Sequence, residues 1–385
     1  MTSSIDFGST LPGHEEARLL DHTGQECYRA TSANFSALRG EHPLYRPYLD
    51  EEHLRAGGPK PRWPNGASFA ACLTHDVDFV ASRNAQMHWR RIVSQGRYLY
   101  SRRDARAVRG LQASLFSFAR ALNPFQGSDP LHAYEQWLAM EAEVGAKSTF
   151  LFLPDRYARR HYTDGGYRYT DRIRFDGQKC SVAEMMREIH RQGWEIGLHA
   201  SWRAYDCADE MKRQKEQVES AIDAPVESVR HHYLHFDIRR TPRVHHEAGL
   251  LVDSSLGFND NIGFRYGTSY PWSLHDLEAD TELPVLELPL IIQDKCLATI
   301  LGCGSEELAM EWASKIVERV RAVGGVLTVL WHPGFLGQQL YENVYRHILG
   351  MLFAEGAYFA TMRQIAEIWL AQKRKDRECL KCARG

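Results

Sequence analysis

The chain has 385 residues, of which 44% are hydrophobic and 25% charged, and this composition excludes the disordered, collagen-like and coiled-coil classes. Its formal net charge of -2 gives no overall positive field that would favour nucleic acid or an anionic membrane as the main partner. The sequence contains neither a signal-peptide pattern at its start nor an apolar run of about eighteen residues. We therefore expect a cytoplasmic protein with no nucleic-acid partner and no integral membrane segment.

Residues 1–65 are polar and interrupted by prolines, as in HPLYRPYL and GGPKPRWPNG. Without long periodic runs they predict an irregular extension that lies on the main body. At the other end, residues 371–385 predict a charged tail. The remainder, residues 66–370, is expected to form one large domain, because α/β barrels exceed two hundred residues as single units.

The first strong signal is the segment GASFAACLTHDVDF, in which an apolar run ends in Asp76 and Asp78. A buried strand that opens into a loop has this pattern, and α/β barrels keep catalytic groups at such strand ends. Two acids at this spacing can aim at one point, one as a metal ligand and the other as a base. A polar turn would explain them equally well if they stood alone.

Residues 83–125 are predicted to be a helical insertion that is rich in arginine and aromatic residues and almost free of acids. Two interpretations stay open for this basic stretch. It is either a solvated helical face or a site for an anionic group such as a phosphate or a nucleotide diphosphate.

Helices and strands alternate through the rest of the chain. Strands are predicted in KSTFLFLP, WEIGLHAS, VESVRHHYLHF, GLLVDSSL, VLELPLII and GGVLTVLWHP, and helices near 131–144, 181–192, 207–222, 305–322 and 340–373. This alternation predicts parallel strands covered by helices, hence a complete or partial α/β barrel, with a doubly wound sheet as the alternative.

Three of these predicted strands end in basic side chains: His199, Arg230 with the histidines after it, and His332. Charged groups at buried strand ends are costly unless they are paired or bind a metal. Together with the two aspartates, they favour a metal-dependent hydrolase over a purely structural role.

These segments, in this order, resemble the motifs of the polysaccharide deacetylase family, also called the NodB homology domain, a carbohydrate esterase family. The resemblance extends from about Ser68 to about Gln364. It implies a distorted seven-stranded (β/α) barrel. The family's T-F-D-D or F-D-x-D motif matches Thr74 to Asp78, which implies that Asp76 is the catalytic base and Asp78 a metal ligand.

The family's second motif, H-[ST]-x-x-H, supplies two imidazole ligands, but here it begins at His199 and ends in Arg203. Catalytic zinc usually has three protein ligands and one open position, so a third ligand has to come from elsewhere. We expect a divalent metal, zinc in the first place, held by Asp78, His199 and His232. The alternatives to His232 are His231, His235 and His75.

The remaining motifs imply the other catalytic residues. Arg230 matches the arginine that orients the base, Asp253 resembles the acid of the fourth motif, and His332 in Leu-Trp-His matches the acid that protonates the leaving group. For substrate binding we expect Arg265 to pair with a carboxylate or phosphate, and Tyr205 and Trp331 to stack on a sugar. A surface loop for Arg265 and barrel packing for the two aromatics are the alternatives.

The resemblance and the expected location imply a hydrolase that removes an acetyl or formyl group from an amino sugar or glycan intermediate of surface polysaccharide synthesis, such as that of lipopolysaccharide or O-antigen. Its partner would be a sugar, a nucleotide-sugar or a lipid-linked glycan. Two alternatives stay open. The chain could hydrolyse a non-glycan C–N bond, or it could be a catalytically dead carbohydrate-binding relative, an interpretation that rests mainly on Arg203.

Overall fold

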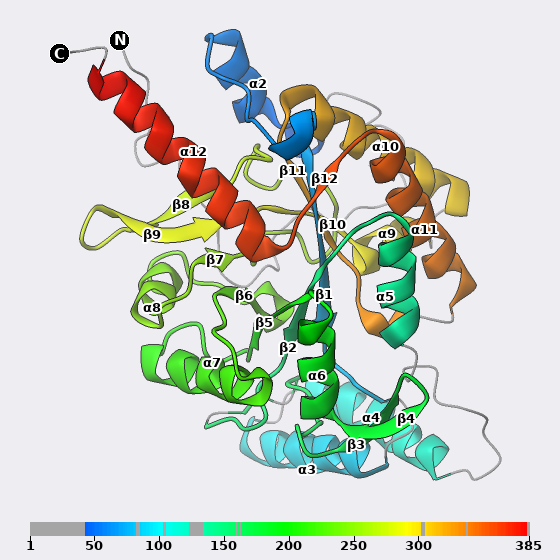
Figure 1. The fold of residues 1–385 in the computed structure, drawn as a ribbon. Helices are drawn as coiled ribbons and strands as arrows, with labels where there is room; N and C mark the ends of the chain where they lie inside the picture. The colour runs from blue at the N-terminus through cyan, green and yellow to red at the C-terminus, as the bar shows by residue number, and fades with distance from the viewer. Residues whose placement is uncertain are drawn as a thin grey trace.

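Ten strands form one sheet in the computed structural model, which describes residues 43–81, 85–102, 105–122, 134–158, 160–161, 163–301, 305–335 and 338–382 (Figure 1). Across the sheet the order is β10, β11, β1, β2, β5, β6, β7, β9, β8, and β12 pairs with β1 beside this path. The strands are β1 (Ala70–Val77), β2 (Thr149–Phe152), β5 (Glu195–Ala200), β6 (Ser228–His231), β7 (Val252–Asp253), β8 (Trp272–Asp276), β9 (Thr281–Glu287), β10 (Leu290–Gln293), β11 (Val326–Leu330) and β12 (Tyr358–Phe359). The predicted extension over 1–42, the ends of the predicted insertion, residues 131–133 of the first predicted helix and residues 383–385 of the tail lie outside the described residues.

The sheet is curled. Strand β10 forms one edge of the sheet and β9 lies next to the other edge. Only Leu288 and Pro289 separate these two strands in the chain, so the two edges have to lie close together. All pairings from β10 to β9 are parallel, and β8 is the antiparallel exception. The predicted mixed α/β fold is therefore confirmed, with the parallel sheet bent into an incomplete barrel.

The strand number differs from the predicted seven. The segment VLELPLII, predicted as one strand, divides at Pro289 into β9 and β10, which lie at opposite ends of the sheet. Proline cannot donate a ladder hydrogen bond, so it marks a natural division. The short β12 and the partly exposed β8 carry no continuous apolar run and add the other two strands.

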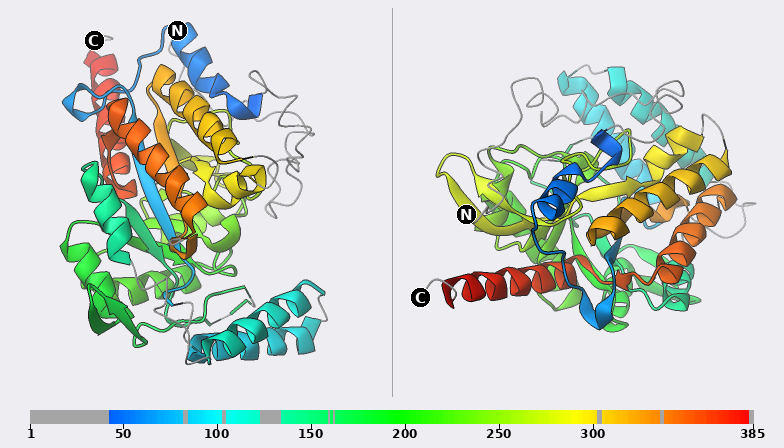
Figure 2. Two further views of the ribbon diagram at one scale, coloured as in Figure 1. Left: turned by 90° about the vertical axis from the view of Figure 1, so that its right-hand side faces the viewer. Right: turned by 90° about the horizontal axis from the view of Figure 1, so that it is seen from above.

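Helices surround the curled sheet (Figures 1 and 2). They are α5 (Tyr134–Glu143), α6 (Val182–Arg191), α7 (Ala208–Ile222), α8 (Thr241–Glu247), α9 (Asp294–Leu301), α10 (Glu306–Val323), α11 (Gln339–Ala354) and α12 (Met362–Cys382). The last of them extends through most of the predicted tail. No described helix combines the length and the apolar character needed to cross a bilayer.

The end of the predicted extension is built into the body. After a 3-10 turn at Pro43–Tyr45, helix α2 (Tyr48–Arg55) places Asp50 against the loop before β8. The buried Asp50 carboxylate accepts hydrogen bonds from the amide and hydroxyl of Ser269, both at 2.7 Å, and from the Thr268 hydroxyl. The Tyr45 hydroxyl donates to Asn261 at 3.1 Å. This part of the chain is thus anchored by specific buried contacts.

A fully buried carboxylate, Glu141, lies between the sheet and its helices. Its Oε1 lies 2.7 Å from His75 Nε2 and accepts a hydrogen bond from the Tyr345 hydroxyl at 2.9 Å, and its Oε2 accepts one from Trp194 Nε1 at 2.8 Å. Burial alone would raise the pKa of Glu141, but His75 and the hydrogen bonds outweigh it and hold the pKa below its ordinary value. Glu141 is therefore ionised and contributes to stability.

We predict that Glu141→Gln lowers the free energy of unfolding by about 3 kcal/mol, because it leaves the partners of a buried charge unpaired. The exposed Glu143→Gln on the same helix is the control, with an expected change within about 0.5 kcal/mol. Since the folded pKa of Glu141 is depressed, its contribution is present above the unfolded pKa and is lost as the pH falls through the folded pKa. Urea unfolding measures both variants, and equal losses would contradict the prediction.

Candidate metal and catalytic site

The polar residues at the ends of neighbouring strands meet at one edge of the sheet. Asp76 lies in β1 with Asp78 just beyond it, His199 lies in β5, Arg230 in β6, and His332 follows β11. These strands run parallel within one sheet, so their carboxyl ends share an edge. Side chains two apart on a strand point to the same side, which directs both aspartates into the site.

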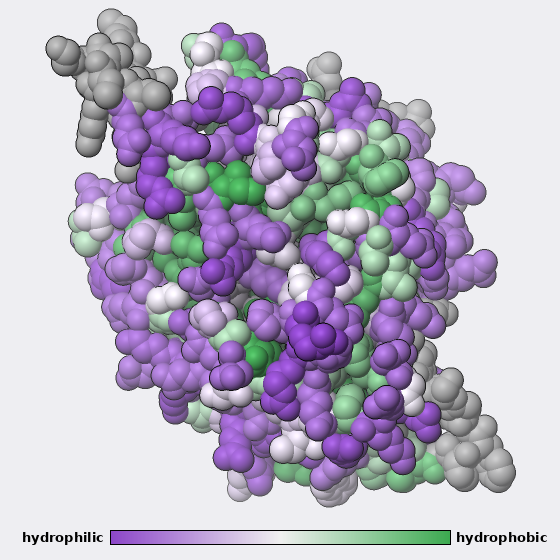
Figure 3. All heavy atoms as spheres, in the orientation of Figure 1, coloured by the Kyte–Doolittle hydropathy of each residue, from purple (hydrophilic) through white to green (hydrophobic). Residues whose placement is uncertain are grey.

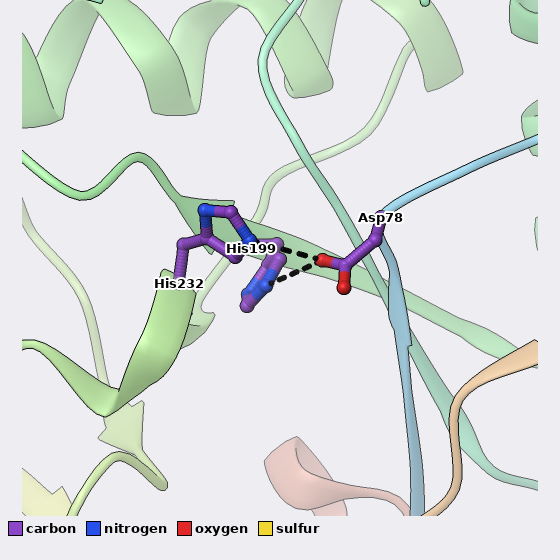
Figure 4. Close-up of side chains that lie close together, drawn as sticks. All are labelled: Asp78, His199 and His232. Atoms are coloured by element: carbon purple, nitrogen blue, oxygen red, sulfur yellow. Dashed lines mark ion pairs between the residues drawn. The ribbon is translucent and has the colours of Figure 1, made fainter. Parts of the chain in front are cut away.

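Asp78, His199 and His232 form a group whose potential ligand atoms all lie within 4.8 Å of one another (Figure 4). Asp78 Oδ1 is 3.3 Å from His199 Nε2 and 3.4 Å from His232 Nε2, yet this buried oxygen accepts no well-formed hydrogen bond from the residues that the structure describes. A buried carboxylate oxygen that faces two ring nitrogens suits a divalent cation. The Asp78 side chain is 17% exposed against 1% for His199, so the group opens to solvent on the Asp78 side.

The outer ring nitrogens of both histidines are held by the protein. His199 Nδ1 lies 2.9 Å from the carbonyl oxygen of Arg230, and since a carbonyl only accepts, this nitrogen carries a hydrogen while Nε2 faces Asp78. His232 Nδ1 lies 3.4 Å from Asp164 Oδ1. Such support of the second nitrogen is typical of metal-binding histidines.

Asp164 fixes the position of His232, and sequence reasoning missed it. Its carboxylate is buried and accepts hydrogen bonds from the amides of His161 at 2.6 Å and Trp202 at 3.0 Å. Burial lowers the pKa of His232, but Asp78 and Asp164 outweigh it and raise the pKa to about 9. Asp164 lies in an irregular stretch without a strand end to mark it.

The other histidines that we considered as third ligand point elsewhere. His231 Nε2 lies 2.9 Å from His245 Nε2, His235 Nδ1 lies 2.6 Å from the carbonyl oxygen of Trp202, and His75 contacts Glu141. His75 is next to Asp76 in β1, so its side chain points to the opposite face of the sheet. Among the candidates, the structure brings His232 to Asp78 and His199.

Asp76 and Arg230 form a buried ion pair beside the three potential ligands. Arg230 Nη1 donates to Asp76 Oδ1 at 2.9 Å, and the guanidinium also donates to the Ser254 carbonyl at 2.7 Å and to the Ser254 hydroxyl at 2.9 Å. Burial raises the pKa of Asp76, but His199, Arg230 and His332 outweigh it and lower the pKa below its ordinary value. The carboxylate is therefore ionised and can accept a proton.

His332 is held by Asp294, not by Asp253. Asp294 Oδ1 and Oδ2 lie 2.9 and 3.0 Å from His332 Nδ1, and Oδ2 also accepts a hydrogen bond from the His332 amide. His332 Nε2 lies 3.8 Å from Asp78 Oδ2. Asp253, predicted as a catalytic residue, instead accepts the Ser255 hydroxyl at 2.6 Å and pairs with Glu287 across β7 and β9. The catalytic role predicted for Asp253 stays a prediction, and Asp294 is the acid that contacts His332. Asp294 follows the apolar run of β10, a pattern that could have revealed it.

The predicted substrate contacts lie in three different settings. Trp331 is fully buried and packs against Tyr345 at 5.2 Å between ring centroids, so its assignment as a sugar contact is wrong. It precedes His332 and points to the opposite side of the strand. Tyr205 is half-buried, with its ring edge-on to His235 at 4.2 Å. Arg265 is also half-buried and donates to the carbonyl oxygen of Gly257 at 2.6 Å.

Tyr233, directly after His232, has a strained backbone. Its φ of 60° and the φ of 52° at Leu234 lie in the left-handed region, which is unfavourable for residues with a Cβ. The Tyr233 ring is 55% exposed and lies 4.7 Å from the His232 ring. Strain of this kind is concentrated at functional sites. Here the strained backbone places the exposed Tyr233 ring at the edge of the candidate site.

No protein-family model matches the chain. No curated protein sequence matches it either. Among solved structures, a Mycobacterium smegmatis protein described as a polysaccharide deacetylase is similar with a TM-score of 0.52 and 20% identity, over 82% of this chain and 95% of that chain. Puue allantoinase is similar with a TM-score of 0.50 and 15% identity, over 81% of this chain and 94% of that chain. At such identities the likeness shows a shared fold.

Proposed function

We propose that the chain is a metal-dependent hydrolase that removes an N-acyl group, acetyl or formyl, from an amino sugar. The observation that carries this proposal is the Asp78, His199 and His232 group beside a buried Asp76–Arg230 pair. The same edge of the sheet also holds the His332–Asp294 pair. Likeness of fold to a protein described as a polysaccharide deacetylase supports the sugar substrate.

Asp78, His199 and His232 would hold the metal, and one carboxylate with two imidazoles suits zinc, although Fe(II) also takes such a set. When bound, a divalent cation polarises the acyl carbonyl and makes water more acidic. The remaining chemistry belongs to the side chains around it.

Asp76 would accept a proton from the attacking water, because Arg230 keeps its carboxylate ionised and fixed in place. The water oxygen bonds to the acyl carbon, and the C–N bond then breaks. His332 would donate a proton to the departing nitrogen, so that a neutral amine leaves. Asp294 holds His332 Nδ1 and thereby directs Nε2 toward the site.

Two arginines support a substrate with an anionic group, such as a nucleotide-linked or lipid-linked amino sugar of surface polysaccharide synthesis in the cytoplasm. Arg91 packs over Phe79, next to Asp78, and its Nε is buried without a hydrogen-bond partner among the described residues. Arg160 donates to the carbonyl oxygen of Gly165, and its own Nε is likewise unpaired. A phosphate or carboxylate would accept hydrogen bonds from both guanidinium groups.

A second candidate function is hydrolysis of a non-glycan C–N bond in a small amide or ureide. The likeness of fold to Puue allantoinase favours this alternative. Both reactions need the same metal ligands, base and acid, so the substrate has to separate them.

A substrate panel tests the proposal. Metal-loaded protein is incubated with N-acetyl and N-formyl amino sugars, their phosphates and nucleotide diphosphates, and allantoin, and released carboxylic acid and amine are quantified. We predict release of acetate or formate from a sugar, and a loss of about 10²- to 10⁴-fold in kcat with Asp76→Asn. Turnover of allantoin alone would favour the second candidate. A metal-loaded chain that binds sugars without turnover would be a binding protein.

A further inference from the structure

Helices α3 (Ala85–Arg102) and α4 (Ala105–Ala121) form a hairpin that projects from the body (Figure 2). It lies at the end of the molecule toward which β1 runs, and therefore on the side of the candidate site (Figure 1). Its base is firmly attached, because Met87 is buried and Arg90 makes a two-pronged ion pair with Asp171 at 2.7 and 2.9 Å. The outer part of the hairpin has no such anchor among the described residues.

Large apolar side chains are exposed along this hairpin to an unusual degree. Of the ten exposed large hydrophobic residues in the described parts of the chain, five belong to its helices and a sixth, Leu122, directly follows α4: Trp89 (54%), Tyr100 (94%), Val108 (43%), Leu115 (48%), Phe116 (65%) and Leu122 (59%). Val108 and Leu115 are seven residues apart in α4 and share one helix face, and Leu122 follows at the same spacing just past the end of the helix. Apolar residues also reach the surface at the lower end of the molecule in Figure 3, where Figure 1 draws these helices. An apolar patch of this kind indicates an interaction surface.

The charge of the hairpin is equally one-sided. Helix α3 contains four arginines and α4 three, and neither contains an acidic residue, although the whole chain has a net charge of -2. Arg97 and Arg120 are exposed. Arginines beside exposed Trp, Phe and Leu on amphipathic helices are the pattern of helices that lie in a membrane interface.

We propose that the α3–α4 hairpin docks this protein on an anionic lipid bilayer. Phosphate headgroups complement its arginines, and the acyl region accepts its apolar side chains. A second copy of the hairpin fits less well, since each hairpin exposes Arg97 and Arg120 and neither helix contains an acid to pair with the arginines of the other copy.

Docking there would bring the candidate site to the bilayer surface. Arg91 of α3 lies 4.4 Å from the Phe79 ring, next to Asp78, and a Cβ on Gly166 would come within 2.9 Å of Arg91 Cγ. The chain around residue 165 in turn contacts the Asp78 carbonyl. Resting on the proposed function, this placement selects a lipid-linked amino sugar as the substrate class, with its headgroup in the site and its chains in the bilayer.

Vesicle flotation of the full chain tests the proposal. We expect binding to phosphatidylcholine vesicles that contain about a third phosphatidylglycerol, weakening at high salt, and little binding to pure phosphatidylcholine. The double variant Leu115→Glu, Phe116→Glu should bind about tenfold less. Phe353→Glu is the matched control, since Phe353 is 62% exposed on α11, outside the hairpin, and should bind like the native chain. Circular dichroism verifies that the variants fold.

Two outcomes would overturn it: no flotation of the native chain, or equal flotation of the double variant. Concentration-dependent dimerisation that the double variant abolishes, without flotation, would assign the patch to a second copy. Hydrolysis of a water-soluble N-acyl amino sugar is measured on the same samples. Hydrolysis without flotation would refute the docking alone, whereas flotation without any hydrolysis would count against the proposed function alone.

Discussion

Asp78→Asn is expected to remove the bound metal and with it the hydrolase activity. The native chain, purified or reconstituted, should contain about one divalent ion per chain, as a single catalytic site requires. Asparagine keeps the shape of Asp78 but removes the charge that faces His199 and His232. Burial raises the pKa of Asp78, yet His232 and His199 outweigh it and hold the pKa well below its ordinary value, so the native ligand is ionised.

His232→Ala should have the same effect, because the second sequence motif ends in Arg203 and His232 supplies the imidazole that this motif lacks. We expect each ligand variant to lose most of its metal by elemental analysis and at least about a hundredfold in activity. His235→Ala is the matched control. It removes another buried histidine three residues away, whose Nδ1 contacts the Trp202 carbonyl at 2.6 Å, and should keep the metal. Loss with His235→Ala and retention with His232→Ala would assign the third ligand differently.

Metal affinity should also rise with pH. Without metal the pKa of His232 is raised to about 9, so at neutral pH its imidazole carries a second proton that a metal has to displace. Below this pKa the apparent affinity should fall by about tenfold per pH unit from this group alone. Isothermal titration with Zn²⁺ at several pH values measures the slope, and a flat profile would show that His232 is not a ligand.

Much of the site could be predicted because its signals are local. An apolar run that stops at Asp76, His199 or His332 marks a buried strand that opens at a shared edge, and parallel topology brings those ends together. The choice between His231 and His232 was harder, since β6 ends at His231 and simple alternation no longer applies beyond it. Only the folded chain shows which imidazole faces Asp78.

The parts that sequence reasoning missed depend on long-range packing. Asp164 lies 68 residues from the His232 that it supports, in a stretch without regular structure. Asp50 and Tyr45 look like parts of an irregular extension, yet they are buried against residues more than two hundred positions away. Trp331 is different, because alternation along the strand predicts that a neighbour of His332 points away from the site.

Asp294, the acid that holds His332, is the second residue whose substitution should have a large effect. Asp294→Asn should lower kcat by about a hundredfold or more while leaving the metal content unchanged. An asparagine amide can turn its NH₂ toward His332 Nδ1 and so favour the wrong tautomer, and it no longer stabilises a protonated imidazole. The two Asp294 oxygens now lie 2.9 and 3.0 Å from that nitrogen.

Asp253→Asn is the comparison variant, because the sequence predicts a catalytic role for Asp253 as well. Burial and the neighbouring Asp253 raise the pKa of Glu287 well above its ordinary value, so sharing of a proton by these two carboxyl groups is favoured over two separate charges. We therefore expect Asp253→Asn to change kcat by less than about threefold, with any effect confined to the free energy of unfolding. The assay is steady-state turnover of the substrate identified in the panel, together with metal content. A large loss of kcat with Asp253→Asn and a small one with Asp294→Asn would support the catalytic role predicted for Asp253, and it would mean that the contact between His332 and Asp294 is structural.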